Sequence, residues 1–440
     1  MILIFYKGKG DIMARDTSNA LRNSVIYSVY VRNYGENGIF KDVEEELVRI
    51  EEFGVDIIWL MPIHPIGIKN KKGSLGCPYA IKDYREVNPE YGTLEDFKSL
   101  VNSIHNLGMK CIIDVVYHHT SPDSYLLEAS PEYFYRKSDG SLGNKVGEWT
   151  DIIDLDYKNQ GLWDYLIDTL KYWVRMGVDG FRCDVASLIP LEFWIKAREE
   201  VSKINPNTIW IAESVHHSFL REIRKDGFIA HSDCELYEAF DICYDYDVNE
   251  EFINYLDGRG SLENYIEKVR QQEVIYPDNY IKLRFLENHD QPRIASKVKD
   301  FELLKVWTEF LYFQKGTTLI YNGQESLESY TPSLFDIDKI NIKNQNKELM
   351  ELMQKLYEIK QMNIIKDGYY DIQIVPNTEV IIASYELQNE KLIGIFNLSE
   401  NIYEVNLKDG KYLNLIDNEV IYILNGKIKL YKNAFILKEI

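Results

Sequence analysis

The chain has 440 residues, of which 45% are hydrophobic, and its formal net charge is −20 at pH 7. A chain of this length exceeds the size at which a single hydrophobic core stops growing, so we expect two or more domains. The negative charge argues against a polyanionic partner, so we expect neither nucleic acid nor an anionic membrane surface to bind this protein.

Residues 1–22 are predicted to form an N-terminal extension, because residues 16–19 carry no apolar period. The apolar run at residues 1–6 is too short for a signal peptide, and no run of about 18 apolar residues predicts a membrane span. The five cysteines are scattered and odd in number, and three of them lie in apolar runs, where a reduced cysteine acts as a small hydrophobe. These features favour a reducing compartment and predict a cytoplasmic location.

Short apolar runs alternate with amphipathic stretches between residues 25 and 362. This alternation is typical of a parallel sheet with helical crossovers, and eight strands predict an α/β fold, a (β/α)8 TIM barrel. Residues 118–152, rich in proline and glycine, are predicted to be a loop or small subdomain inserted after the third strand. The predicted strands are 25–31, 56–61, 110–117, a fourth that carries Asp184, 208–213, 238–244, 280–286 and 317–321; the predicted helices are 40–53, 94–107, 162–176, 191–204, 261–272, 301–314 and 347–362.

The pattern changes near residue 364, where short runs of β-forming residues replace the helical period. Such runs occur at 380–385, 392–397, 421–423 and 428–430, and turn signals at 408–410 and 425–426 separate them. We therefore predict a barrel domain over residues 23–363, followed by an antiparallel β-sandwich domain over residues 364–440.

Acidic or imidazole side chains end four of the apolar runs. The runs are 114–120, 180–185, 210–214 and 285–290, and each of them places these side chains at its C-terminal end. In a (β/α)8 barrel the active site lies at the C-terminal ends of the strands. Arg182 and Asp184 share one face of their strand because side chains alternate, and a guanidinium beside a carboxylate favours the ionised form. Asp184 is therefore a candidate nucleophile, with a purely structural Arg–Asp pair as the alternative.

In this order and spacing the four motifs resemble those of the α-amylase family of glycoside hydrolases, glycoside hydrolase family 13. The resemblance extends from about Val25 to Glu325. It implies a retaining mechanism, which needs an ionised carboxylate and a protonated carboxyl group about 5–5.5 Å apart. By this resemblance Asp184 is the nucleophile, Glu213 the general acid and base, and Asp290 the residue that holds sugar hydroxyls and stabilises the transition state. A dry setting after 210–212 should also raise the pKa of Glu213.

The resemblance also assigns substrate contacts. Tyr79 matches a tyrosine that stacks on the sugar ring, and the apolar face of a pyranose suits an aromatic face. His119 and His289 are expected to donate hydrogen bonds to the same sugar, Arg182 to orient Asp184, and Arg293 to line the entrance. The alternatives are a core tyrosine and buried histidines without substrate contact.

Two departures from the family pattern concern its usual calcium ion. The family commonly has an asparagine calcium ligand where this chain has His118, and a Lys-His pair where it has Ser187 and Leu188. Calcium prefers clustered oxygen ligands, and no acidic calcium-binding loop is present in the sequence. We therefore expect an enzyme without a metal or other cofactor, in which the imidazole of His118 bridges the inserted loop to the barrel. A metal ligand is the alternative role for His118.

Together these observations predict a retaining hydrolase that acts on short α-linked gluco-oligosaccharides through a covalent glycosyl-aspartate. A transglycosylase or a phosphorylase with the same site is the first alternative. A non-catalytic amylase-like binding protein is the second, although Asp184, Glu213 and Asp290 are all present. The linkage specificity and the oligomeric state, monomer or dimer, are left open by the sequence.

Overall fold

Eight parallel strands form a closed barrel in the computed structural model, which describes residues 17–440. Neighbouring strands follow the order β1-β10-β9-β8-β7-β6-β3-β2, and β2 pairs with β1 to close the circle. The predicted (β/α)8 barrel is therefore confirmed. The barrel strands are β1 (Val25–Val29), β2 (Ile57–Leu60), β3 (Lys110–Val115), β6 (Gly180–Cys183), β7 (Ile209–Ala212), β8 (Ile242–Tyr244), β9 (Lys282–Arg284) and β10 (Thr317–Tyr321).

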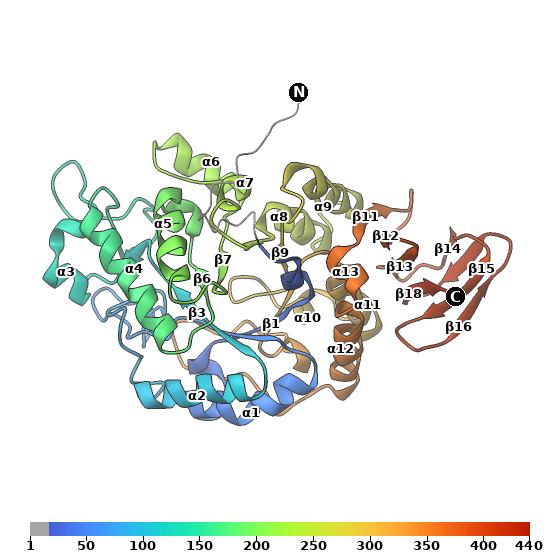
Figure 1. Cartoon of the computed structure of the whole chain (residues 1–440), viewed down its shortest axis with the longest axis horizontal. Coiled ribbons are helices and arrows are strands. Elements are labelled where there is room, and N and C mark those ends of the chain that lie inside the picture. The colour runs from blue at the N-terminus through green and yellow to red at the C-terminus, as the bar shows by residue number, and fades with distance from the viewer. Residues whose placement is uncertain (1–16) are drawn as a thin grey trace.

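Helices surround the barrel, and their apolar faces explain their positions (Figure 1). In α2, Thr93 and Asp96 form a capping box at the first turn, and Phe97, Leu100 and Ile104 form the buried face. The longer helices are α1 (Phe40–Glu52), α2 (Leu94–Asn106), α4 (Gln160–Arg175), α5 (Leu191–Ser202), α8 (Tyr246–Leu256), α9 (Leu262–Ile275), α11 (Phe301–Phe313) and α12 (Lys347–Lys360). Shorter helices are α3 (Tyr125–Ala129), α6 (His217–Lys225), α7 (Asp233–Leu236), α10 (Ile294–Lys297) and α13 (Asn363–Asp367), with 3-10 turns η2 (Asn19–Asn23), η3 (Val31–Asn33), η4 (Pro131–Tyr133), η5 (Ala186–Leu188) and η6 (Gln324–Ser326).

The interior of the barrel is filled with side chains. Ile26, Trp59, Ile112, Ile211 and Leu283 belong to one buried cluster inside the strands. The alternate side chains of the same strands point outward and pack under the helices in a second, larger core. The barrel is thus a packed core, and any binding site must lie at one of its ends.

The segment inserted after β3 is anchored by a short antiparallel pair. Strand β4 (His119–Thr120) pairs with β5 (Ile153–Asp154), and His119 lies opposite Asp154. Between them the chain contains α3 and η4, so the predicted insertion is present, with a short helix that its sequence pattern did not predict. The pairing holds the insertion against the C-terminal end of β3.

The C-terminal strands form an antiparallel domain beside α11, α12 and α13 (Figure 1). A six-stranded sheet has the order β11-β12-β13-β18-β15-β16, and β14 and β17 form a two-stranded sheet. Val405 and Leu430 of the small sheet share one buried cluster with Ile395 and Leu437 of the large sheet, so the two sheets pack face to face. The strands are β11 (Tyr369–Ile374), β12 (Val380–Leu387), β13 (Glu390–Asn397), β14 (Tyr403–Asn406), β15 (Gly410–Asn414), β16 (Val420–Ile423), β17 (Lys427–Leu430) and β18 (Ala434–Glu439).

The expected N-terminal extension falls mostly outside the described residues, and the domain boundaries at 22/23 and 363/364 stay proposals. Among residues 17–440, no helix combines the length and the apolar character needed to cross a membrane.

Most barrel strands are shorter than the sequence predicts, and the difference is largest for β8 and β9. The expected strand 238–244 is only β8 (Ile242–Tyr244), because the backbone N–H groups of residues 238–240 donate to Glu235 and Leu236 in a turn after α7. The expected strand 280–286 is only β9 (Lys282–Arg284). Lys282 of β9 and acidic side chains of α7 and α8 form a buried polar network beside these strands.

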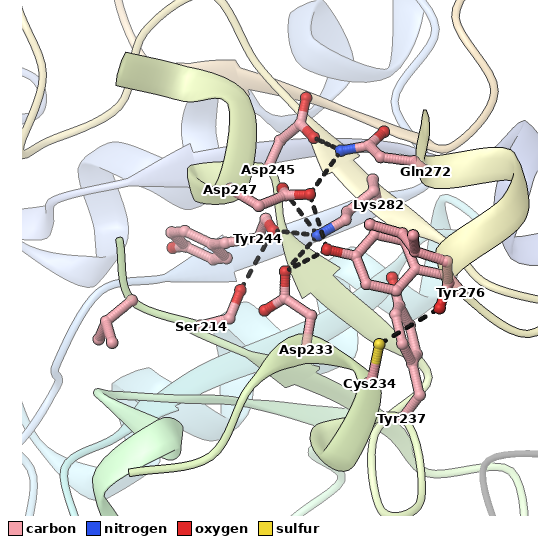
Figure 2. A network of polar contacts seen from close by, with 12 residues as sticks. Ser214, Asp233, Cys234, Tyr237, Tyr244, Asp245, Asp247, Gln272, Tyr276 and Lys282 are labelled. Atoms are coloured by element: carbon pink, nitrogen blue, oxygen red, sulfur yellow. Dashed lines mark hydrogen bonds and ion pairs between the residues drawn. The ribbon is translucent and has the colours of Figure 1, made fainter. Parts of the chain in front are cut away.

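Figure 2 shows this network, in which the ammonium of Lys282 contacts Asp233 at 2.6 Å and Asp247 at 2.9 Å. The same ammonium lies 4.5 Å from the ring centroid of Tyr276 and donates to the backbone oxygen of Tyr244. Burial lowers the pKa of Lys282, but the charges of Asp233 and Asp247 outweigh it and raise that pKa above its ordinary value. The network therefore ties β9 to α7 and α8 through a charged core.

Removal of this ammonium should destabilise the protein strongly. We expect Lys282→Ala to lower the free energy of unfolding by about 3–5 kcal/mol, because two buried carboxylates lose their counterion. Lys268→Ala is the matched control, since Lys268 is exposed and pairs with Glu251 at the surface; it should cost less than about 1 kcal/mol. Urea unfolding of the two variants measures both values, and equal losses would contradict a structural role for the buried network.

Candidate active site

The predicted acids lie at the C-terminal ends of barrel strands. Asp184 directly follows β6 and Glu213 directly follows β7, and these two strands are paired neighbours. Asp290 lies in the loop after β9. Asp184 and Glu213 are both 7% exposed, so both carboxyl groups line a largely dry site.

A single guanidinium joins the two strand-end acids. Arg182, which is fully buried, lies 2.9 Å from Asp184 Oδ1 through Nη1 and 3.0 Å from Glu213 Oε1 through Nη2. Its Nη1 also lies 2.9 Å from Asp114 Oδ1, and its Nε donates to the hydroxyl of Tyr244. Because both acids contact one planar group, their carboxyls are held next to each other at the mouth of the barrel.

The environment of Glu213 favours its protonated form. Burial raises the pKa of Glu213 above its usual value, Arg182 opposes this, and the charges of Asp184 and Asp290 raise it further. The other oxygen, Oε2, accepts a 2.7 Å hydrogen bond from the backbone N–H of Val185. Val185 has a φ of 37°, a left-handed conformation that is rare for a β-branched residue, so the backbone is strained where it meets this carboxyl group. A carboxyl group with a raised pKa keeps its proton near neutral pH and can therefore act as a general acid.

The predicted sugar platform forms a connected cluster on the opposite side of Arg182. The hydroxyl of Tyr79 lies 2.7 Å from His289 Nε2, and the two rings stack with centroids 5.5 Å apart. His289 Nε2 also lies 3.1 Å from Asp290 Oδ2, and Tyr79 donates to Asp114 Oδ2. Burial lowers the pKa of His289, which favours the neutral imidazole, although the charge of Asp290 acts in the opposite direction. Tyr79, His289 and Asp290 are therefore brought together.

His119 lies at the start of the insertion, beside two other potential metal ligands. Its Nδ1 is 3.2 Å from His118 Nδ1, and His118 Nδ1 is 3.6 Å from Asp154 Oδ1. The ring of Trp149 contacts both imidazoles. The bridge that we expected from His118 to the inserted loop stays a prediction, because the 3.6 Å separation from Asp154 of β5 is too long for a hydrogen bond. Within residues 17–440, this is the one group of three or more side chains with metal-ligand spacing.

Arg293 does not line the entrance, and that expectation is wrong. Its side chain is fully buried, its Nη1 lies 2.7 Å from Glu287 Oε1, and the guanidinium lies 4.2 Å from the ring centroid of Tyr321. The Nε donates to the backbone oxygen of Tyr330. Arg293 is therefore a core residue that secures the loop after β9.

Two further residues of the site were not singled out by the sequence. Asp114 contacts Arg182 and Tyr79, and burial raises its pKa while Arg182 partly offsets that increase. Asp114 belongs to the motif at residues 114–120, one of the four that carry the acids, and this membership could have identified it. Tyr244 holds the other side of Arg182 from β8, and nothing in its local sequence distinguishes it from a core tyrosine.

Comparisons with known proteins agree with this geometry. The model of the α-amylase catalytic domain matches residues 5–140 and 147–359, and that of the bacterial α-amylase C-terminal domain matches residues 371–437. The crystal structure of an α-amylase from Lactobacillus plantarum superposes with a TM-score of 0.93 at 45% identity, covering 96% of this chain and 100% of that one.

A noncanonic maltogenic α-amylase from Thermotoga neapolitana superposes with a TM-score of 0.86 at 34% identity, covering 96% of this chain and 99% of that one. An α-1,4-glucan:maltose-1-phosphate maltosyltransferase from Salinibacter ruber is 32% identical over 209 residues, which are 42% of this chain and 31% of that enzyme. The matched catalytic model spans most of the barrel that carries the three acids. This chain therefore belongs to the α-amylase family of glycoside hydrolases.

Proposed function

We propose that this protein cleaves α-glucosidic bonds in short α-gluco-oligosaccharides with retention of configuration. The observation that carries the proposal is the contact of Asp184 and Glu213 with the single guanidinium of Arg182. Retaining hydrolysis requires two carboxyl groups close together, one ionised and one protonated. Arg182 beside Asp184 and the raised pKa of Glu213 support that division of roles.

In the first step, a carboxylate oxygen of Asp184 attacks the anomeric carbon. The glycosidic oxygen leaves with the proton of Glu213, and a covalent glycosyl-aspartate forms. In the second step, Glu213, now ionised, takes a proton from water, which attacks the same carbon and releases Asp184. Two inversions at one carbon retain the α configuration.

The remaining residues of the site position the sugar. Asp290, whose side chain is 42% exposed, is suited to accept hydrogen bonds from sugar hydroxyls. Tyr79 offers an aromatic face, and the stacked ring of His289 orients it. His119 is 5% exposed and belongs to the same end of the barrel. These residues are therefore suited to bind the glucosyl unit whose anomeric carbon Asp184 attacks.

A buried apolar cluster next to the two acids supports transfer as a second reaction. Val185, Leu188 and Val215 belong to one apolar cluster, which Trp149 and Phe219 extend. An acceptor sugar bound over the partly buried rings of Trp149 and Phe219 would exclude water and resolve the glycosyl-enzyme in its place. A maltosyltransferase among the relatives agrees with this alternative.

Five free cysteines, three of them buried, are compatible with the proposed cytoplasmic location.

A panel of substrates tests this function. Maltotriose, isomaltotriose and trehalose supply α-1,4, α-1,6 and α-1,1 bonds. NMR identifies each product and the anomer in which it is first released. We expect cleavage of at least one of them, with the α anomer released first. An initial β anomer, or a folded sample that cleaves none of them, would contradict the proposal.

Two additions to the same experiment separate the alternatives. Soluble starch tests the preference for short substrates, which would be wrong if starch were cleaved as fast as maltotriose. Added maltose or phosphate tests transfer, since products longer than the substrate indicate a sugar acceptor and a sugar 1-phosphate indicates phosphorolysis. A sample carrying Asp184→Asn controls for contaminating glycosidases.

A further inference from the structure

We infer that His118, His119 and Asp154 form a binding site for a divalent transition-metal ion such as Zn²⁺, and not for calcium. The three side chains come from the end of β3 and from the β4–β5 pair that anchors the insertion. All three are buried, with 2%, 5% and 0% of their surface exposed. This inference replaces the expectation of an enzyme without a metal.

The distances between the donor atoms fit a small tetrahedral ion. Zinc binds imidazole nitrogen and carboxylate oxygen at about 2.0–2.2 Å, which places neighbouring ligand atoms about 3.3–3.5 Å apart. The observed separations are 3.2 Å between the Nδ1 atoms of His118 and His119 and 3.6 Å between His118 Nδ1 and Asp154 Oδ1. The donor atoms of all three residues lie within 4.8 Å of one another, so adjustments of the side chains can bring them around one ion.

The carboxylate of Asp154 provides an independent observation. Its Oδ2 accepts a hydrogen bond from the backbone N–H of Lys145, whereas its Oδ1 is buried and has no hydrogen-bond partner. Within the described part of the chain, the one basic side chain within 4 Å of the Asp154 carboxylate is the imidazole of His118, at 3.6 Å. The ammonium of Lys145 lies 5.5 Å from the ring centroid of Tyr135 and makes no ion pair with Asp154. A buried carboxylate oxygen without a partner is costly, and a bound cation would satisfy it.

The same ligand set does not suit the calcium ion that the family implies. Calcium takes six to eight oxygen ligands, whereas this cluster offers two nitrogens and one carboxylate. Imidazole nitrogen is a preferred ligand of zinc, copper, iron and nickel. The replacement of an asparagine by His118 thus changes which metal the site selects.

The cluster borders a cavity on the side of His118. His118 forms part of the wall of a cavity of about 370 Å³, which lies between the insertion and the segment after α6. Trp149 packs edge-on against His118 with ring centroids 5.9 Å apart. The cavity leaves room for water as a further ligand. An ion at His119 Nδ1 would also leave Nε2 as the N–H atom of that ring, which fixes its orientation as a donor.

Metal binding itself, without any activity assay, tests the inference. The full-length protein is treated with a chelator and dialysed, and it is then titrated separately with Zn²⁺, Co²⁺ and Ca²⁺. We expect one equivalent of Zn²⁺ to bind, one equivalent of Co²⁺ to give the strong visible absorption of tetrahedral cobalt, and Ca²⁺ to bind at least tenfold more weakly. Ca²⁺ that binds more tightly than Zn²⁺ would overturn the inference, as would the absence of stoichiometric Zn²⁺ binding.

Variants identify the ligands. His118→Asn and Asp154→Asn should each weaken Co²⁺ binding by at least about 100-fold, because even indirect partners of a metal ligand contribute about 10–100-fold. His217→Asn, an exposed histidine at the start of α6, is the control and should bind Co²⁺ as the unchanged protein does. Circular dichroism confirms that each variant is folded. Cobalt absorption that persists in both folded ligand variants would place the ion elsewhere and overturn the assignment.

Discussion

Asp184→Asn should abolish turnover while leaving the fold intact. Loss of the nucleophile should lower kcat by at least about 10⁴-fold, as seen when catalytic nucleophiles are removed. The amide keeps nearly the size of the carboxylate and still offers an oxygen to Arg182, which lies 2.9 Å from Asp184 Oδ1. Steady-state rates on the cleaved oligosaccharide, together with a urea unfolding curve, measure both effects.

The matched control for this variant is Asp164→Asn. Asp164 is an exposed residue of α4 that pairs with Lys196 at the surface, whereas Asp184 is buried. Its kcat should stay within a factor of two of that of the unchanged protein. An Asp184→Asn protein that retains more than one per cent of the original rate would mean that another group attacks the anomeric carbon.

Glu213→Gln should separate substrates by their leaving groups. Without its acid, the enzyme should lose about 10²–10⁴-fold on an unactivated oligosaccharide. A dinitrophenyl glucoside needs no protonation, so its first step, read as a burst of released phenol, should be largely spared. Glu222→Gln, on the exposed face of α6, is the control and should behave normally. Equal losses on both substrates would argue against the acid role of Glu213.

The pH dependence gives this prediction a second readout. Glu213 acts as an acid only while protonated, and burial raises its pKa above the usual value for a carboxyl group. The rate on an oligosaccharide should therefore persist at pH values where an ordinary glutamate is ionised, and it should fall as pH rises through the raised pKa. In Glu213→Gln the alkaline decline of the first step should disappear, because glutamine does not titrate.

The barrel elements with a regular apolar period could be predicted from the sequence. The structure places α2 at Leu94–Asn106 and β10 at Thr317–Tyr321, within a residue of the expected ranges. By contrast, α8 (Tyr246–Leu256) was not predicted, because its buried positions include Asp247 and Asn249, and polar residues there break the apolar period. Asp247 is buried because it pairs with Lys282, a contact that no local pattern reveals.

The site shows the same division. Alternation along β6 was enough to place Arg182 and Asp184 on one face, and the ion pair between them is present. The sequence could not show that Arg293 pairs with Glu287 in the core. The local sequence around a charged loop residue does not indicate whether its side chain is exposed or buried. The contact of Glu213 with Arg182 likewise required the pairing of β6 with β7.

The sequence by itself determined the order of the eight barrel strands, the position of the helices with a regular apolar period, and the acids that follow the strands. The apolar period of an element and the residues that follow a strand are local properties, so they can be predicted from the sequence without a structure. Only the tertiary structure decided that one guanidinium contacts two acids, that Arg293 is buried, and that donor atoms of His118, His119 and Asp154 lie within 4.8 Å of one another. These facts depend on barrel closure and on the register of β4 with β5, which bring together residues from separate segments of the chain.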